Sequence, residues 1–498
     1  MAVSETTPII VGVGQINDRP DNRVEGMDPI ELMAAALEKA EQDAGAGLIA
    51  DADYLGVVQQ ISFHHLGNVC APLAERLRTS PAESFQTHGP NGDSPVMLLN
   101  EAANRIGAGE ARIALICGAE ALRTAAALAA ASTPGKKVDA TREAAQRREP
   151  SYAQSYGLVA PVDVYPLYEN ALRASLGQSF EEAQAESGKI WSRFSEIAAG
   201  NDNAWIRKPV SAAEIVTPSE ANRPIAYPYN KLMVANASVN QGAGFIVTSV
   251  GEARARGIKE DRWIYVGHGA AAHEAESPMR RDRYDRSASM EVSIRKTLEL
   301  NAVRPQDLDL VELYSCFPCI PKMARRIIDW PVDKPASVFG GLTFGGGPIG
   351  NYMSHAVASM VDRLRSEGGT GLLFANGGYA THNHSIVIAS QPIAAAQFPK
   401  SYDFQAEADA LRDPIPDLDR DYAGPAKVES YTVFHRRDGS PRNGVVVAMT
   451  PEGKRTLANV PGDDVATLQR LMSADDEPVG AAGTIMASDG PLRRWHFA

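Results

Sequence analysis

The 498-residue sequence has few cysteines, no excess of basic residues and no long uninterrupted apolar run. Four cysteines are far too few for a disulfide scaffold at this length, which favours a reducing compartment. Lys and Arg number 49 against 61 Asp and Glu, so the net charge of −12 provides no global attraction to nucleic acid or anionic membranes. The most apolar long stretch, residues 111–131, contains Arg112, Glu120 and Arg123 and cannot span a bilayer without burying them. We therefore expect no nucleic-acid partner and no membrane span.

The first fifteen residues (MAVSETTPIIVGVGQ) have no basic region and only a five-residue apolar run, so they do not resemble a signal peptide. With the cysteine count, this predicts a cytoplasmic protein. The hydrophobic fraction of 44% and charged fraction of 22% are globular values, and the length exceeds that of one compact core. We therefore expect a folded chain of more than one domain.

Short apolar runs alternate with helical patterns over roughly the first 395 residues. Residues 8–13 (PIIVGV) predict a buried strand. Asp28-Pro-Ile-Glu then predicts a helix start, with Asp28 as N-cap and Glu31 at the third helical position. Strand, helix and strand in this rhythm favour a layered α/β fold.

Two strand-like runs recur after a little over 250 residues, which indicates an internal duplication. The runs WIYVG and GLLFANGG resemble the earlier runs IIVGV and IALICG, respectively. We therefore predict two α/β halves, residues 1–258 and 259–395. The stretch at about 133–229 is rich in charge, proline and tyrosine, and we predict an inserted loop domain there.

The pattern changes after Pro392. Residues 396–424 include a Pro- and Asp-rich segment (LRDPIPDLDRDYAG) and predict a linker. Residues 425–498 contain short apolar runs separated by turn signals, which predict a small all-β domain. Its role cannot be deduced from its residues, and we expect a packing or interaction module.

A glycine-rich segment at residues 340–350 (GGLTFGGGPIG) precedes a predicted helix. Gly345, Gly347 and Gly350 formally satisfy G-x-G-x-x-G, but Pro348 inside the motif and its place deep in the chain argue against a dinucleotide site. Two interpretations remain. Free backbone N–H groups at the helix start favour an anion, and a glycine turn also permits close packing of helices.

Three further segments carry candidate chemistry. Cys316 follows a predicted strand and is a candidate nucleophile, acid or buried apolar residue. His382 and His384 would share one face of a strand, but no third ligand lies at local spacing, so no metal is predicted. Gly-Asp-Ser at residues 92–94 is typical of serine hydrolases, but no downstream Asp-x-x-His follows.

Together these segments resemble the thiolase superfamily, in order and spacing, over residues 5 to about 392. Residues 235–244 (ANASVNQGAG) resemble the thiolase stretch G-N-A-S-G-x-N-D-G-A, and residues 340–350 resemble G-G-x-x-x-x-G-H-P-x-G. Residues 310–317 are similar to the strand before N-E-A-F, or before H-D-C-F in sterol-carrier-protein thiolases. The C-terminal extension makes the chain most similar to thiolase-like proteins of type 1, which resemble acetyl-CoA acetyltransferases.

This resemblance implies a thiolase fold, that is, duplicated α/β halves layered αβαβα. It also implies a CoA thioester as ligand or substrate, no further cofactor, a role in lipid metabolism, and a monomer or homodimer. Ser238 matches the serine that contacts the pantetheine chain. The binding residues carried over by the resemblance are Asn236, Ser238, Gly346 and Gly347.

The family's catalytic side chains are replaced in this sequence. The acylated cysteine falls on Gly92, the activating histidine on Gly347 and the second cysteine on Ala375. The Asn-Glu or His-Asp pair falls on Tyr314 and Ser315, and Cys316 alone keeps a family catalytic type. Because glycine and alanine have no nucleophile or transferable proton, the covalent thiolase route cannot run on these positions.

Three functions follow as hypotheses. The first is a protein that binds CoA or acyl-CoA with little or no thiolase activity. The second is an active acyltransferase with relocated residues, in which Cys316 is nucleophile or acid and His382 or His384 is the base. The third is a scaffold that binds a protein partner.

Overall fold

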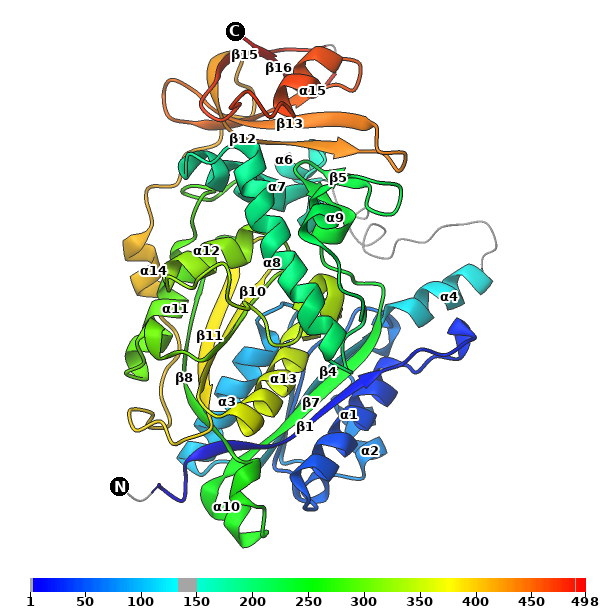
Figure 1. Ribbon diagram of the computed structural model, residues 1–498, viewed down its shortest axis with the longest axis vertical. Helices are drawn as coiled ribbons and strands as arrows, with labels where there is room; N and C mark the ends of the chain where they lie inside the picture. Colours follow the sequence, from blue (N-terminus) through cyan, green and yellow to red (C-terminus); the bar gives the residue numbers. More distant parts are fainter. Residues whose placement is uncertain (1–2, 133–149, 489) are drawn as a thin grey trace.

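The computed structural model describes residues 3–132, 150–488 and 490–498 (Figure 1). Its largest element is a nine-stranded sheet in the order β3-β2-β4-β7-β1-β8-β11-β10-β9. The first half of the chain supplies β1 (Pro8–Asn17), β2 (Tyr54–Val57), β3 (Glu83–Gln86), β4 (Ile113–Ala121) and β7 (Asn240–Ser249). The second half supplies β8 (Ile264–His273), β9 (Leu310–Leu313), β10 (Thr370–Gly377) and β11 (His382–Ala389).

The two halves repeat one strand arrangement. In the first, β1 is antiparallel to β7, β7 is antiparallel to β4, and β4 is parallel to β2. In the second, β8, β11, β10 and β9 repeat these relations in the same order. The halves meet where β1 pairs antiparallel with β8, with Ile9 opposite Tyr265. The runs that the sequence matched in pairs therefore occupy equivalent strands, β1 with β8 and β4 with β10.

Helices separate and cover the two halves of the sheet. The central layer contains α3 (Ser94–Ala108) and α13 (Tyr352–Glu367), each of which contacts strands of both halves. The outer layers are α1 (Pro29–Ala44) with α2 (Cys70–Leu77) on the first half, and α11 (Ala288–Leu300) with α12 (Cys319–Ile327) on the second. This is the predicted αβαβα layering. Further helices on this body are α4 (Leu122–Ser132), α10 (Val250–Ala255) and α14 (Gln405–Leu411).

Local sequence fixes the start of α1 as predicted. The Asp28 carboxylate accepts a hydrogen bond from the Glu31 backbone N–H at 2.9 Å, and the Glu31 carboxylate accepts one from the Asp28 N–H at 3.1 Å. This capping box satisfies two N–H groups that the helix itself leaves without partners. The apolar face of α1, including Leu32 and Leu37, is buried against the sheet.

The described part of the predicted loop insertion is mainly helical. It contains α6 (Tyr152–Ser155), α7 (Pro161–Ser175), α8 (Phe180–Gly200), α9 (Ala212–Val216) and the short strands β5 (Pro224–Ala226) and β6 (Tyr229–Asn230). Figure 1 shows α7 next to the C-terminal strands and α8 running from there across the face of the layered body. Residues 133–149 of the predicted insertion lie outside the described residues.

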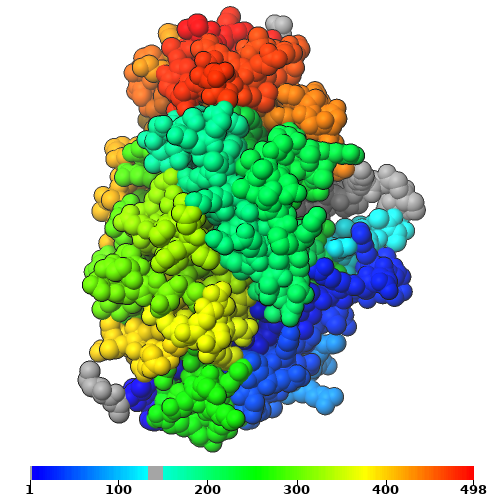
Figure 2. All heavy atoms as spheres, in the orientation of Figure 1, coloured from blue at the N-terminus to red at the C-terminus, as the bar shows by residue number. Residues whose placement is uncertain are grey.

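The C-terminal strands form a small barrel. They are β12 (Gly424–His435), β13 (Pro441–Met449), β14 (Arg455–Val460), β15 (Ala482–Met486) and β16 (Arg494–Phe497). The order β13-β14-β16-β15-β12 closes because β12 also pairs with β13. Figure 2 shows this barrel at one end of the molecule, on the inserted helices.

Two details of the C-terminal prediction need correction. The domain is not all β, because α15 (Val465–Leu471) buries Leu468 and Leu471 in the barrel core. The stretch predicted as linker contains α14, whose Ala408 packs against Ala272 and Val292. No helix among the described residues is long and apolar enough to cross a membrane.

Candidate functional site

The motif segments singled out in the sequence meet at one place in the fold. The Ala235 N–H donates to the Cys316 carbonyl at 3.1 Å, and the Asn236 N–H donates to the Leu342 carbonyl at 3.0 Å. The Gly347 N–H in turn donates to the Asn236 carbonyl at 2.9 Å. Backbone hydrogen bonds therefore hold the Cys316 turn, the 235–238 segment and the glycine loop together.

The glycine loop is a packing device. Gly346 has φ = +108°, and a Cβ there would lie 2.1 Å from the Gln241 side-chain oxygen. A Cβ on Gly350 would lie 2.6 Å from the backbone of Pro90. Next in the chain, the Asn351 amide donates to the Gly118 carbonyl at 2.6 Å, at the start of α13. Since these residues are buried against protein atoms, the geometry favours close helix packing over an anion site.

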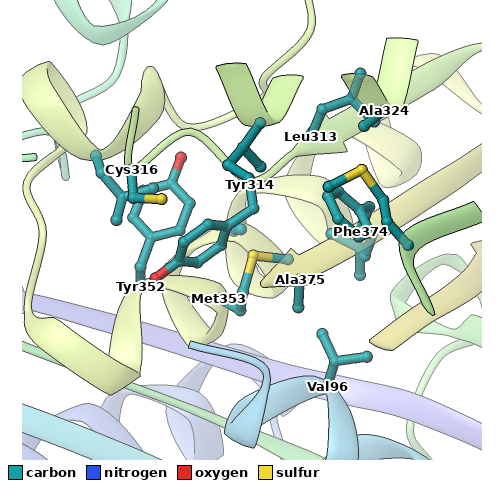
Figure 3. Close-up of a cluster of buried hydrophobic side chains, with 14 of the residues drawn as sticks. Val96, Leu313, Tyr314, Cys316, Ala324, Tyr352, Met353, Phe374 and Ala375 are labelled. Atoms are coloured by element: carbon teal, nitrogen blue, oxygen red, sulfur yellow. The ribbon is translucent and has the colours of Figure 1, made fainter. Parts of the chain in front are cut away.

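The position of Gly92 is enclosed by neighbouring atoms. A Cβ on Gly92 would lie 2.1 Å from the Asn376 carbonyl oxygen and 2.3 Å from the Tyr314 hydroxyl oxygen. Tyr314 belongs to the buried cluster of Figure 3, with Tyr352, Met353 and Ala375. Its ring packs edge-on against Tyr352, with centroids 5.7 Å apart. The tyrosine from the β9 turn thus occupies the space beside the start of α3.

Cys316 lies in the same cluster and is 8% exposed (Figure 3). Burial raises the pKa of its thiol to about 12, and hydrogen bonding, led by Tyr165, offsets only part of this effect. The group is therefore a protonated thiol at neutral pH, whereas a nucleophilic cysteine reacts as thiolate. The structure places Cys316 among apolar and tyrosine side chains.

The two candidate histidines have different surroundings. His384 is buried, with its Nε2 3.1 Å from the Asn100 amide nitrogen and its ring stacked on Tyr402. The side chain of His382 is 20% exposed, and its Nε2 lies 3.2 Å from a Glu276 carboxylate oxygen. No hydrogen bond or ring contact among the described residues joins Cys316 to either histidine.

Of the predicted binding residues, Gly346 and Gly347 are buried in the glycine loop, whereas Asn236 and Ser238 reach the surface. Ser238 is exposed and Asn236 is half-buried. The Ser238 backbone N–H donates to the Asn236 side-chain oxygen at 3.2 Å, which orders the turn. The Thr343 hydroxyl donates to the Val234 carbonyl at 2.9 Å, so the glycine loop supports the segment. The Ser238 hydroxyl is thus presented to solvent from a backbone fixed on both sides.

Sequence reasoning named Tyr314 and Asp93 without the contacts they make here, and it missed His273. Tyr314 fills the space at Gly92. Asp93 and His273 lie beside His382, and one ligand-type atom each of Asp93, His273 and His382 lies within 4.8 Å of the other two. No local spacing predicts these contacts, because the residues come from distant parts of the chain. Only a prediction that strands β8 and β11 pair would have placed His273 beside His382.

Comparisons with known proteins agree with this fold. Residues 403–490 match the family described as thiolase-like protein type 1 additional C-terminal domain. The crystal structure of a monomeric SCP2-thiolase like protein type 1 (STLP1) from Mycobacterium smegmatis is 28% identical, covers 100% of both chains and gives a TM-score of 0.83. Comparison with curated proteins found no match.

More distant structures share the layered body. The Ltp2-ChsH2(DUF35) aldolase is 18% identical, and the match covers 78% of this chain and 100% of that chain with a TM-score of 0.59. Human mitochondrial 3-ketoacyl-CoA thiolase in complex with CoA is 14% identical, and the match covers 78% and 99% with a TM-score of 0.58.

The class is thereby defined: the chain has the thiolase fold with a small C-terminal β-barrel domain, as predicted. Within that class, the full-length likeness and the C-terminal match confirm the predicted resemblance to thiolase-like proteins of type 1, which includes their additional C-terminal domain.

Proposed function

We propose that this protein binds CoA or an acyl-CoA thioester, in lipid metabolism, without the standard covalent thiolase reaction. The observation that carries the proposal is the closed space at Gly92, where Tyr314 and the Asn376 carbonyl leave no room even for a Cβ. The position that resembles the family's acylated cysteine is therefore filled by protein. A covalent acyl intermediate has no place to form there.

The other replaced positions support the same proposal. Ala375 is fully buried in the cluster of Figure 3 and has no ionisable group. A Cβ on Gly347 would lie 3.3 Å from both the Asn236 and Leu342 carbonyl oxygens, so a larger side chain would have to displace the loop. Removing all members of a cooperative catalytic set leaves orientation and binding as the remaining contributions.

One residue that the resemblance assigns to CoA binding, Ser238, is accessible to a ligand. Ser238 presents its hydroxyl to solvent on a segment that backbone hydrogen bonds hold against the glycine loop. A hydroxyl both donates and accepts, which suits the amides of a pantetheine chain. The structure of a human thiolase with CoA, on the same fold, adds support from a distant protein.

The test pairs calorimetric titration of the purified full chain with CoA and acetoacetyl-CoA and an acetoacetyl-CoA thiolysis assay. We expect saturable binding and no thiolysis. A Gly347→Ala variant should weaken binding by disturbing the loop, whereas Gly47→Ala, where a Cβ meets nothing within 4 Å, serves as the matched control.

Each outcome decides between the hypotheses. Absence of binding would refute the proposal and favour the scaffold. Clear turnover that is lost in Cys316→Ser would refute it in favour of relocated chemistry.

A further inference from the structure

His273 and His382 are direct partners across two antiparallel strands. His273 is the last residue of β8 and His382 the first of β11, and the strand register places them opposite each other. Cross-strand partners project from the same face of a sheet. Their ring centroids are accordingly 5.0 Å apart, with the rings inclined at 75°.

Asp93 approaches this pair from the start of α3. It occupies the N-cap position, yet its carboxylate accepts no capping hydrogen bond from the helix. The residue is 8% exposed, and one carboxylate oxygen lies within 4.8 Å of a ring nitrogen of each histidine, as those two nitrogens do of each other. Since Asp normally caps a helix at this position, a buried carboxylate turned toward two imidazoles points to a ligand between them.

The backbone holds these three groups in place. A Cβ on Gly377, at the end of β10, would lie 2.9 Å from the Gly92 nitrogen, which shows how closely the residue before Asp93 approaches the sheet. One face of α3 further along carries Asn100, whose amide contacts His384 on β11 at 3.1 Å. The start of α3 is therefore packed against the end of β10, and Asn100 further along contacts β11, the strand that carries His382.

We propose that Asp93, His273 and His382 bind one divalent metal ion of the zinc class. Two imidazoles and a carboxylate form a donor set that suits zinc and its first-row neighbours, whereas calcium and magnesium prefer oxygen ligands only. Ligand bonds of about 2.0–2.2 Å place the donors of a tetrahedral site about 3.3–3.6 Å apart, so donors that lie within 4.8 Å of one another need to close by no more than about 1.5 Å. The exposure of His273 leaves its ring free to turn.

Three protein ligands leave further coordination positions open. His273 is exposed and the His382 side chain is 20% exposed, so an ion can enter from solvent. Glu276, 79% exposed, lies 3.2 Å from His382 and adds a second negative charge that favours a cation. This donor set shares no residue with the predicted CoA-binding residues Asn236, Ser238, Gly346 and Gly347, so either property can fail without the other.

The test is calorimetric titration of the chelator-treated full chain with ZnCl₂, together with the visible absorption of bound Co²⁺. We expect one saturable site per chain and a Co²⁺ spectrum of nitrogen and oxygen ligation. His273→Ala and His382→Ala should each weaken Zn²⁺ binding by at least ~10-fold, because each removes a direct ligand. Zinc should also raise the unfolding temperature of the parent chain and not of these variants.

The matched control is His64→Ala/His65→Ala, which removes two exposed neighbouring histidines elsewhere on the surface. This variant should bind Zn²⁺ like the parent. His273→Ala changes an exposed side chain, so we expect its circular dichroism to stay that of the parent. Absence of saturable binding, or binding unchanged in His273→Ala and His382→Ala, would overturn the proposal, as would loss of binding in the His64/His65 control.

Discussion

The two residues just before α3, Gly92 and Asp93, have surroundings of opposite character. Gly92 faces a packed cluster, where Tyr314 and the Asn376 carbonyl occupy the space that a side chain would need. The next residue, Asp93, faces two histidines at a partly exposed edge. Two consecutive residues therefore border, respectively, a packed cluster, which we call the filled side, and a partly exposed histidine pair, which we call the open side.

This difference shows that one backbone arrangement can place side chains of unlike chemistry next to each other. The motif segments of this chain meet through hydrogen bonds of their main chains. Their side chains, however, are glycine, alanine and tyrosine on one side and ligand-type groups on the other. Function resides in such local groups and is not implied by the fold alone.

The largest effect on stability is expected when the side chain that fills the space at Gly92 is removed. Tyr314→Ala should lower the free energy of unfolding by ~3–5 kcal/mol, because it removes a buried aromatic ring and leaves a cavity. Tyr314→Phe keeps the ring and should cost less than ~1.5 kcal/mol. Urea unfolding of both variants gives the comparison. If alanine and phenylalanine cost the same, the ring does not fill the site.

The filled side also contains a buried acid, Glu312, which accepts a hydrogen bond from the Tyr352 hydroxyl at 2.7 Å. Burial raises the pKa of Glu312 to about 7. As pH rises from about 4.5 to 7, the unfolded chain releases this proton and the folded chain keeps it, so stability falls. The shift corresponds to a loss of about 3 kcal/mol that is complete above pH 7.

Glu312→Gln should therefore make the unfolding free energy less dependent on pH between about 4.5 and 7, measured by urea unfolding at each pH. The dependence should not vanish, because burial also raises the pKa of Glu120 to about 7. The exposed Glu110→Gln is the control and should keep the parent slope. An unchanged slope in Glu312→Gln would show that this carboxyl is ionised in the folded protein.

A smaller effect on stability is expected when a side chain is added at Gly92. Gly92→Ala places a Cβ against the Tyr314 hydroxyl and the Asn376 carbonyl and should cost ~1–3 kcal/mol. Combined with Tyr314→Ala it should cost less than the sum of the two, because one of the clashing groups is gone. Gly47→Ala, in open space, is the control for thermal unfolding. Simple additivity would argue against contact between residues 92 and 314.

Much of the fold could be predicted from short apolar runs and their order. The matched runs of β1 with β8 and β4 with β10 indicated the duplication that the strand order shows. The strand β16 was missed because RWHF has no apolar run of its own and is fixed by pairing with β15. The helix α15 was missed although Asp464 caps it, because seven residues between strands give little periodic signal.

The sequence predicted which segments form the site, but it did not predict which side chains contact one another there. Sequence motifs identified Gly92, Cys316 and the glycine loop, but no motif says which side chain fills the space at Gly92. His382 was noted with His384, its neighbour on the strand, whereas its cross-strand partner is His273. Such a pairing depends on the register of β8 and β11, which is set by the whole sheet.

The smallest expected effect concerns Ser238, in the segment that we propose to contact CoA. Ser238→Ala should weaken CoA binding by roughly 2- to 10-fold, because one hydrogen bond contributes about 0.5–1.5 kcal/mol. Ser238 is exposed, so unfolding should be unaffected, and Ser366→Ala, another exposed serine at the end of α13, is the matched control. Calorimetric titration of the three proteins with CoA measures the difference. If both serine variants bind like the parent, the pantetheine chain does not contact the 235–238 segment.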